Sequence, residues 1–488
     1  MENLKTSKST LLEKVFYCMG GVGGGSFCWS FISGFITMYY TNSVGMAAAA
    51  VGTMMLVARV LDGITDIIFG AIMERFPSRF GKTRHWLLIS APLMAVCVLL
   101  CFNTPQGLSE SGKIGYMYFT YILISAVAYT IYGAAFGALM SRMSTDKKDI
   151  EHISVSYMLC VMVSATVVYI LTVTLLENWG GTINNQPAWT KVSIVYAIIT
   201  FVTILLSFLI KEKVPIKTED GEIKRTPLKE GVKACLKYKY FWLLAFIFGL
   251  FYAASALMGS SSIYYILYVI GDYTKVNITG IPSLVATIVA YALVPLLLKK
   301  INKMLLIRLG LILFVVSKLI PLINPTNLTL FVVCSIISQF GLAPCVSLLF
   351  TLSVDFIIFV AYKTGLRAEG FAGIGGNLGV KIGTGIGSAM VGWVLAWGQF
   401  DGLAPVQGEQ AKIAIIMITL TLPAVLILAQ FIVTLFWDLD KKLPIVMAEA
   451  EEAAKAASGE IEEPAQVDVN GPMVTAMEEK VEEKTEDK

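Results

Sequence analysis

Twelve long apolar stretches run through this chain, and they limit its possible folds more than any other feature. A helix needs about 20 mostly apolar residues to cross the hydrocarbon core of a bilayer. The stretches cover residues 16–40, 46–73, 86–103, 115–140, 153–176, 191–210, 240–269, 277–298, 303–323, 327–353, 371–397 and 411–436. Each is continuously apolar and lacks the short alternation of a barrel strand. The sequence therefore predicts an all-α membrane protein with twelve transmembrane helices.

The content of charged and reactive side chains narrows the class of protein. Only 15% of the residues are charged, whereas soluble domains average about 25%. The two histidines, His85 and His152, lie at loop edges without the spacing of metal ligands, and no nucleophile–base set is found. We therefore predict a protein that is not an enzyme, that needs no cofactor and that binds no nucleic acid. Its predicted partners are the lipid bilayer and a small-molecule substrate, and it is predicted to be a monomer.

Lysine and arginine gather in alternate loops. The basic clusters are Lys5, Lys8 and Lys14; Arg75, Arg79, Lys82 and Arg84; Arg142, Lys147 and Lys148; and Lys299, Lys300 and Lys303. The loops of the opposite side are nearly bare, with no Lys or Arg in 41–45 or 324–327. Because basic residues stay on the cytoplasmic side of a bilayer, both termini are predicted to be cytoplasmic. An even number of spans requires the same, and the cytoplasmic membrane is the predicted location.

A long basic loop divides the spans six and six. Residues 211–240 carry nine Lys and Arg side chains, and Pro215 and Pro227 argue against one continuous helix there. We predict an N-terminal six-helix bundle over 1–210 and a C-terminal six-helix bundle over 241–437, with 211–240 as a cytoplasmic loop. Two such halves are the layout of the major facilitator fold.

The C-terminal tail, residues 438–488, differs in composition from the rest. From Glu449 onward it has thirteen Asp and Glu against four Lys and no aromatic residue. Such a segment cannot bury enough apolar surface to offset the entropy lost on ordering. The sequence therefore predicts an acidic, disordered cytoplasmic tail, for which a solvated segment without a partner is favoured over a regulatory one.

Three ionisable side chains cluster in the second predicted span. Asp62 and Asp66 are four residues apart and share a helix face, and Arg59 precedes Asp62 by three residues on the same side. Charge inside a membrane costs several kcal/mol and usually marks an ion pathway. Two carboxylates on one inward face can bind a hard cation such as Na⁺ or share a proton. The alternative is a salt-bridge network that only holds helices together.

The second half offers further candidates. Asp355 is expected on the tenth helix, just after its apolar stretch, and Lys381 lies in the eleventh predicted span. Lys381 is expected to pair with a second-span aspartate or with Asp355. Asn377 lies in the same glycine-rich segment, 375–383, which permits a close approach of helices. In the seventh span, Tyr264 and Tyr265 either stack on a substrate or belong to an interfacial aromatic belt.

Two passages resemble a known family. Residues 59–86 read RVLDGITDIIFGAIMERFPSRFGKTRHW, and 355–387 contain Asp355, the run KTGLRAEG from Lys363, and Lys381. Both are similar to signatures of the glycoside–pentoside–hexuronide:cation symporters, the melibiose permease group of the major facilitator superfamily. The resemblance implies that Asp62 and Asp66 bind the coupling cation, that Thr130 supplies a hydroxyl ligand, and that Lys381 lies near this site. It also implies transport by alternating access.

The chain departs from this family pattern at the sugar site. The acids that engage sugar in the melibiose permease fall on Ser26 and near Gly133, and the arginine of the fifth span has no counterpart in 154–159. Buried sugar hydroxyls need polar partners, because an unmet hydrogen-bonding group is costly. The candidate substrate-binding residues are Ser26, Gly133, Tyr264, Tyr265 and Asn377. The departures also remove a cation ligand of the family, which weakens the case for Na⁺ and favours H⁺ coupling or no coupling.

Three functions compete on these observations. The first is a secondary active transporter that moves a small organic solute, such as a sugar or glycoside, with H⁺ or Na⁺. The second is a relative repurposed for a less polar, aromatic or amphipathic solute or a lipid, by proton-linked or facilitated transport or by export. The third is a sensor or scaffold that does not transport. The retained charges Asp62, Asp66 and Lys381 argue against the third, since buried charge without a function is an unnecessary cost.

Overall fold

The fold is described from a computed structural model. It describes residues 8–76, 78–140, 142–144, 146–180, 183–213, 235–272, 275–364, 369–404, 406–443 and 445–447. Most of the predicted central loop and the acidic tail from residue 448 onward lie outside these residues. The first part of the predicted tail, 438–443 and 445–447, is ordered instead of disordered, because Leu439 is buried and Asp438 forms ion pairs with Lys239 and Lys442.

The described residues are helical almost throughout. In the first half the helices are α1 (Leu11–Gly20), η1 (Gly21–Cys28), α2 (Trp29–Met38), η2 (Tyr39–Ser43), α3 (Ala48–Arg75), α4 (Arg84–Cys101), α5 (Glu110–Ile122), η3 (Leu123–Ala128), α6 (Tyr129–Met140), α7 (Lys147–Gly180) and α8 (Gln186–Phe208). In the second half they are α10 (Lys239–Tyr264), η4 (Tyr265–Val269), α11 (Val276–Leu298), α12 (Lys303–Leu319), η6 (Ile320–Ile323), α13 (Leu328–Thr364), α14 (Glu369–Trp397), α15 (Glu409–Ile416), η7 (Met417–Thr421) and α16 (Leu422–Leu435).

Twelve helical segments of the described chain, some made of an α-helix and an adjoining π-helical turn, are long enough to cross a bilayer. By length and composition, eleven helices of the described chain qualify as spans, several of them an α-helix continued through a π-helical turn. The twelfth is α3, which has 28 residues and carries the charged Arg59, Asp62 and Asp66. This confirms the predicted all-α fold with twelve transmembrane helices.

Two helices are longer than their apolar stretches predicted. α7 runs from Lys147 to Gly180 instead of 153–176, and α13 runs from Leu328 to Thr364 instead of 327–353. The extra turns of α13 carry Asp355 and Lys363. Hydropathy detects only the part of a helix that lies in hydrocarbon, whereas the backbone hydrogen bonds continue into polar surroundings.

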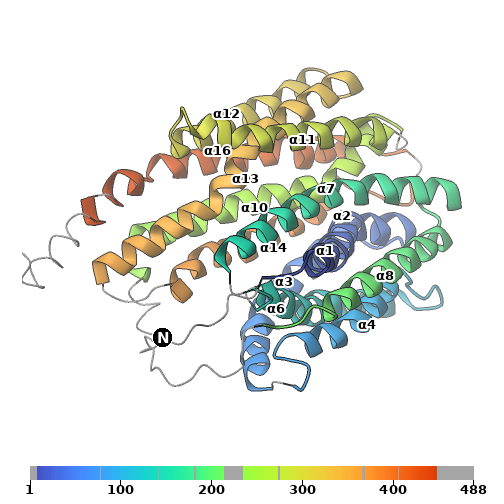
Figure 1. Cartoon of the computed structure of the whole chain (residues 1–488). Coiled ribbons are helices and arrows are strands. Elements are labelled where there is room, and N and C mark those ends of the chain that lie inside the picture. The colour runs from blue at the N-terminus through green and yellow to red at the C-terminus, as the bar shows by residue number, and fades with distance from the viewer. Residues whose placement is uncertain are drawn as a thin grey trace, which may run out of the picture.

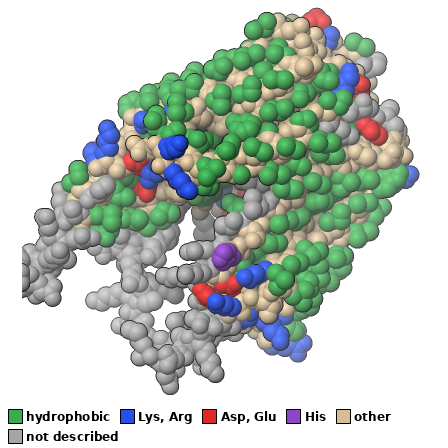
Figure 2. Space-filling model, turned by 45° about the horizontal axis from the view of Figure 1, so that its top comes forward, with side chains coloured by type: hydrophobic (Ala, Val, Ile, Leu, Met, Phe, Trp, Pro, Cys, Tyr) green, Lys and Arg blue, Asp and Glu red, His purple; other side chains and the backbone are tan. Residues whose placement is uncertain are grey.

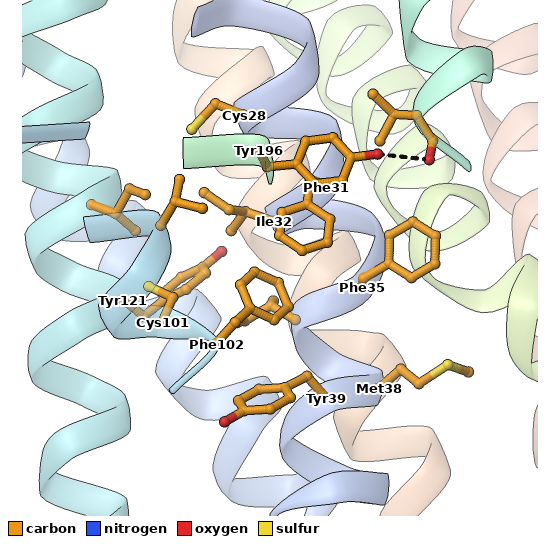
Figure 3. Close-up of a cluster of buried hydrophobic side chains, with 14 of the residues drawn as sticks. Cys28, Phe31, Ile32, Phe35, Met38, Tyr39, Cys101, Phe102, Tyr121 and Tyr196 are labelled. Atoms are coloured by element: carbon orange, nitrogen blue, oxygen red, sulfur yellow. Dashed lines mark hydrogen bonds between the residues drawn. The ribbon is translucent and has the colours of Figure 1, made fainter. Parts of the chain in front are cut away.

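Each half of the chain packs around its own apolar cluster. The first cluster is drawn mainly from α1 to α8, and the second from α10 to α16. In the first, Phe31 of α2 lies between Phe102 and Tyr196, with both pairs of ring centroids 4.2 Å apart, and the Tyr196 hydroxyl donates to the Val168 carbonyl (Figure 3). Aromatic packing of this kind ties α2, the end of α4, α7 and α8 together.

The helices run roughly side by side, and the two halves meet along a seam (Figure 1). Across it α14 packs on α3, α10 on α2, and α11 on α7. Glycine permits the closest approach: a Cβ added to Gly52 of α3 would lie 2.6 Å from the Ala389 carbonyl oxygen of α14. Figure 2 shows hydrophobic side chains covering the flank of the molecule, while charged ones gather toward its ends. This distribution suits a protein surrounded by lipid.

Candidate functional site

The three charged side chains of α3 face the seam between the halves. The Arg59 guanidinium lies 3.6 Å from the Asp62 carboxylate, one helical turn away. The side chain of Asp62 is 11% exposed, whereas that of Asp66, a turn further along the helix, is 45% exposed. The pair therefore consists of one deeply placed carboxylate and one that solvent can reach.

Lys381 reaches this pair from the other half of the chain. Its ammonium group forms an ion pair with Asp66, lies 3.6 Å from the nearer Asp62 carboxylate oxygen, and donates a hydrogen bond of 3.1 Å to the Asp62 carbonyl. The lysine side chain passes beside Gly63 of α3, where an added Cβ would lie in ordinary contact, 3.9 Å from the lysine Cδ. Lys381 is thus a bond between the halves at the carboxylates.

Two hydroxyl groups complete the oxygen cluster. Thr130 of α6 donates to the Asp62 carboxylate at 3.2 Å, and its Oγ1 lies 3.4 Å from Oγ1 of Thr65. Thr65 also donates to the Asp62 carbonyl at 3.2 Å. Carboxylate, hydroxyl and carbonyl oxygens are the ligands that hard cations prefer. Thr65 is absent from the sequence prediction, although its position three residues after Asp62 places it on the same helix face.

An aromatic platform flanks the charged cluster. The Arg59 guanidinium lies over the Trp29 ring, 4.3 Å from its centroid, and Trp29 packs against Tyr129 of α6 at 4.6 Å. A guanidinium over an indole face is a favourable cation–π arrangement. Sequence reasoning missed both rings, although Trp29 follows the candidate Ser26 by three residues and so lies near it on the same helix.

The predicted substrate residues of the first half differ in their surroundings. Ser26 is buried, and its hydroxyl donates to the Val161 carbonyl at 3.2 Å, so this hydroxyl already has an acceptor in α7. Gly133 is exposed on α6, one turn from Thr130, and a Cβ there would meet no atom within 4 Å. The face of α6 beyond the cation cluster is therefore open space.

In the second half only Asn377 lies near the cluster. It is exposed on α14, one turn before Lys381. Tyr264 is buried in the seam, where its hydroxyl lies 2.9 Å from that of Thr41. Tyr265 is buried within the second half, donates to the Pro325 carbonyl at 2.6 Å and stacks on Phe331 at 4.6 Å. Neither tyrosine hydroxyl is free to receive a substrate in this conformation.

The tyrosines instead point to a closed end of the seam. Besides the Thr41–Tyr264 contact, Asn42 donates to the Tyr268 hydroxyl, and Ser260 donates to the Ser33 carbonyl at 2.7 Å. Each bond joins α2 or η2 of the first half to α10 or η4 of the second. We call the set Thr41, Asn42, Tyr264 and Tyr268 the tyrosine latch. Its polar pairs could not be read from the sequence because they join residues more than 200 positions apart.

Asp355 lies in a different ion-pair set. It pairs with Lys303 of α12, which also lies 3.2 Å from Asp440. Of the two partners considered for Lys381 the structure selects the α3 aspartates, and Asp355 therefore does not join that charge cluster. The reason is helix packing: the end of α13 that carries Asp355 is directed toward α12, whereas α14 lies on α3.

A single carboxylate with several hydrogen-bond donors, Glu212, lies beyond the membrane spans of the first half. Glu212, after α8, accepts hydrogen bonds from the backbone N–H of Lys82, Thr83 and Arg84 at the start of α4, and from the Thr83 hydroxyl at 2.7 Å. Burial by itself would raise the pKa of Glu212. The hydrogen bonds from Thr83 and its neighbours outweigh burial and hold this pKa below its usual value. Glu212 thus closes the exposed N-terminus of α4.

The charges of the α3–α14 cluster sum to zero. Arg59 and Lys381 contribute two positive charges, and Asp62 and Asp66 two negative ones. Among the described residues no group of three or more His, Cys, Asp and Glu could hold a transition metal. The arrangement offers oxygen ligands to a hard cation, but the Lys381 ammonium group already contacts the oxygens of Asp62 and Asp66. Such a site can exchange a tethered cation for a free one, which is the chemistry of an ion-coupled membrane transporter.

Comparison with known proteins identifies the family. Residues 16–441 match the family described as MFS/sugar transport protein, and the chain belongs to it. It is 28% identical over 447 residues to the uncharacterized symporter YnaJ of Bacillus subtilis, covering 90% of this chain and 94% of that protein. It is 27% identical to the isoprimeverose transporter of Lactiplantibacillus pentosus, over 87% of this chain and 88% of that protein. The resemblance to the sugar–cation symporters is thereby confirmed.

Solved structures agree in fold. A bacterial homolog of the human lysosomal transporter Spinster, described as inward-facing and unoccupied, aligns with a TM-score of 0.60 over 93% of this chain and 98% of that one, at 14% identity. The chain is a multi-pass membrane protein of the major facilitator type, and it performs secondary active transport of a small solute.

Proposed function

We propose that the protein carries a sugar or glycoside across the cytoplasmic membrane together with Na⁺ or H⁺, and that Asp62 and Asp66 bind the cation. The observation that carries the proposal is the convergence of these carboxylates with the Thr130 hydroxyl at one point of the seam. Relatives named "putative glycoside/cation symporter" in Escherichia coli and "isoprimeverose transporter" in Lactiplantibacillus pentosus support a sugar-like solute.

Lys381 supplies the coupling step in this mechanism. When no cation is bound, its ammonium group neutralises the two carboxylates and joins α14 to α3. A Na⁺ ion, or a proton on one carboxyl group, removes the need for this charge and releases Lys381. Because Lys381 belongs to the second half of the chain, its release changes the interaction between the halves. Cation binding therefore biases the equilibrium between the two open states, as coupling requires.

Transport proceeds by alternating access of two six-helix units. We assign residues 1–210 and 241–437 to these units, joined by the cytoplasmic loop 211–240 and followed by the tail 438–488. Both termini are placed in the cytoplasm by the positive-inside rule. With this orientation the tyrosine latch closes the outer end, and the 45% exposed side chain of Asp66 is reached from the cytoplasm. The protein acts as a monomer and has no enzymatic role.

The substrate is placed between the cation cluster and the open face of α6. Trp29 and Tyr129 offer aromatic faces of the kind on which apolar sugar faces or aromatic groups stack, and Asn377 offers an amide group. The open space at Gly133 favours a bulkier or less polar solute than the carboxylates of the melibiose permease type would select. An aryl glycoside combines both preferences. A purely aromatic or amphipathic solute is the second candidate, and it rests on the same open face.

A binding screen tests the proposal. The purified protein is heated with free sugars, with aryl glycosides and with the matching aglycones, in sodium chloride or choline chloride and at two pH values. Ligand binding raises the melting temperature. We expect stabilisation by glycosides that increases with Na⁺ or with proton concentration. Stabilisation by aglycones alone, without dependence on either cation, would instead establish the second candidate.

A further inference from the structure

A large cavity lies on the second half, away from the cluster on α3. Its volume is about 910 Å³, and it lies between the first turns of α12 and the segment that follows α16. The side chains that matter for what it can bind are Asn302, Lys303, Leu305, Arg308, Leu435 and Lys441. The cavity is therefore lined by both basic and apolar side chains, a combination that suits an amphipathic anion better than a small hydrophilic one.

Lys303 and the acidic side chains of the cavity already have partners. Asp440 lies 3.2 Å from the Lys303 ammonium group, which also pairs with Asp355. Asp438 lies 2.9 Å from Lys239 and 2.8 Å from Lys442. Their charges are thus compensated within the protein.

Two cations of the cavity have no such compensation. Among the described residues neither Arg308 nor Lys441 has a carboxylate within ion-pair distance. One guanidinium nitrogen of Arg308 donates to the Thr434 carbonyl at 2.6 Å, but its Nε is buried without an acceptor. A buried donor without an acceptor costs about 1–3 kcal/mol. An anion in the cavity would supply the missing negative charge beside Arg308 and Lys441.

The apolar side chains next to the cavity indicate that the anion belongs to a membrane lipid. The lining side chains Leu305 and Leu435 are about half exposed, at 49% and 52%, and so is Leu309, at 48%, which lies one turn beyond Leu305 on α12. They lie along membrane-spanning helices and therefore face hydrocarbon. The exposed Lys299 and Lys300 directly precede this region, as in basic loops of the cytoplasmic face.

The geometry points to a site for an anionic phospholipid of the cytoplasmic leaflet. Its phosphate binds Arg308 and Lys441, and its acyl chains lie along Leu305, Leu309 and Leu435. A guanidinium binds phosphate through paired hydrogen bonds, and basic pockets between helices on this side of a membrane suit anionic head groups. The lipid would hold α12 and α16 together at their cytoplasmic ends. This site is independent of the solute that the protein carries.

Lipid titrations of the full-length protein in detergent test the site. Thermal stability is followed while phosphatidylglycerol or phosphatidylcholine with identical acyl chains is added, with inorganic phosphate as a third ligand. The variants are Arg308→Gln and Lys441→Gln. Lys300→Gln is the matched control, because it removes a nearby exposed lysine that does not line the cavity. Lys441→Gln removes no described hydrogen bond, so it remains informative if Arg308→Gln fails to fold.

We expect phosphatidylglycerol to stabilise the wild-type protein more than phosphatidylcholine or phosphate does. Loss of one charge-assisted contact should weaken the apparent affinity for phosphatidylglycerol roughly tenfold in Arg308→Gln and Lys441→Gln. Lys300→Gln should bind as the wild type does. Equal effects of the two lipids, an equal effect of free phosphate, or unchanged affinity in Lys441→Gln would each overturn the assignment.

Discussion

Lys381 brings a positive charge to two carboxylates that belong to the other half of the chain. Its ammonium group pairs with Asp66 and lies 3.6 Å from Asp62. Without the lysine, two carboxylates would face each other across one turn of α3, with only Arg59 beside Asp62. Like charges held close together destabilise a fold unless a cation comes between them. In the proposed mechanism, this single residue sets how strongly the two carboxylates attract a free cation.

Replacing this lysine should make the stability of the protein depend on sodium. In Lys381→Gln we expect a loss of about 1–3 kcal/mol, less than for a fully buried pair, because the Asp66 side chain is 45% exposed. Sodium chloride should restore more of the melting temperature than choline chloride at equal ionic strength. Lys412→Gln, which breaks only an exposed pair with Glu409, is the control. An equal response of both variants to the two salts would argue against a cation site at the α3 carboxylates.

Glu212 predicts a pH dependence that arises outside the membrane. Its pKa is held below the usual value of about 4.3 by hydrogen bonds at the start of α4. A carboxyl group with a lowered pKa in the folded state stabilises the fold above its unfolded pKa. That contribution is lost as the pH falls through the folded pKa.

Glu212→Gln should therefore cost about 1–3 kcal/mol at neutral pH. The difference in melting temperature from the wild type should narrow as the pH is lowered below about 4, where the wild-type carboxyl also becomes protonated. Glu409→Gln, with a side chain that is 85% exposed, should show neither effect. A difference that stays constant from neutral to acidic pH would show that the carboxylate charge is not what stabilises this junction.

At the scale of helices, the ends of α2 and α10 form the closed end of the seam. The tyrosine latch joins them through the Thr41–Tyr264 and Asn42–Tyr268 contacts. Tyr265, the neighbour of Tyr264, bonds instead to Pro325 within its own half. Tyr264 and Tyr268 therefore form contacts between the two halves, whereas Tyr265 forms a contact within the second half.

Removing the latch hydroxyls should shift the protein toward a state open at this end. Each lost hydrogen bond is worth about 0.5–1.5 kcal/mol, so Tyr264→Phe with Tyr268→Phe should change the ratio of open to closed molecules by roughly tenfold. The measurement is the rate at which an impermeant maleimide labels Ser260→Cys in a background without the native cysteines. Tyr265→Phe serves as the control and should leave the rate unchanged. Equal rates in all three proteins would exclude a gating role for the latch.

The helices themselves were largely predictable from the sequence, because a membrane demands long apolar segments. Hydropathy predicts the position of α3 even though three charged side chains lie inside it, because the residues on either side of them are apolar. The π-helical turns, such as Gly21–Cys28 in the first rod, were not predictable. In this turn Gly23 and Gly24 lie directly against Thr203 and Tyr132 of other helices, and such contacts are not recorded in a local sequence pattern.

Prediction of the site succeeded where partners lie on one helix and failed where they depend on packing. The common face of Arg59, Asp62 and Asp66 follows from helical spacing alone. The choice of Lys381 between these aspartates and Asp355 depends on which helix lies against α14. The roles of Trp29 and the latch tyrosines likewise depend on contacts across the fold, and a single sequence does not contain them.

At the scale of the whole molecule, Lys381 and the tyrosine latch both lie in the seam between the halves, at different distances from its closed end. The latch closes one end, while the Lys381 contacts lie further along α3, where Asp66 is open to solvent. A cation that displaces Lys381 would loosen the seam near its middle, and a solute beside Trp29 would be held at the same level. The proposed coupling thus follows from the arrangement of two rigid halves around a neutral charge cluster.

Uptake into proteoliposomes tests this account most directly. A glycoside identified in the binding screen is supplied outside vesicles that carry an inward gradient of Na⁺ or of protons. The account predicts accumulation against the solute gradient by the wild type and by Asp355→Asn, whose carboxylate lies in another ion-pair set. It predicts that Asp62→Asn with Asp66→Asn abolishes accumulation. Full gradient-driven accumulation by that double variant would contradict it.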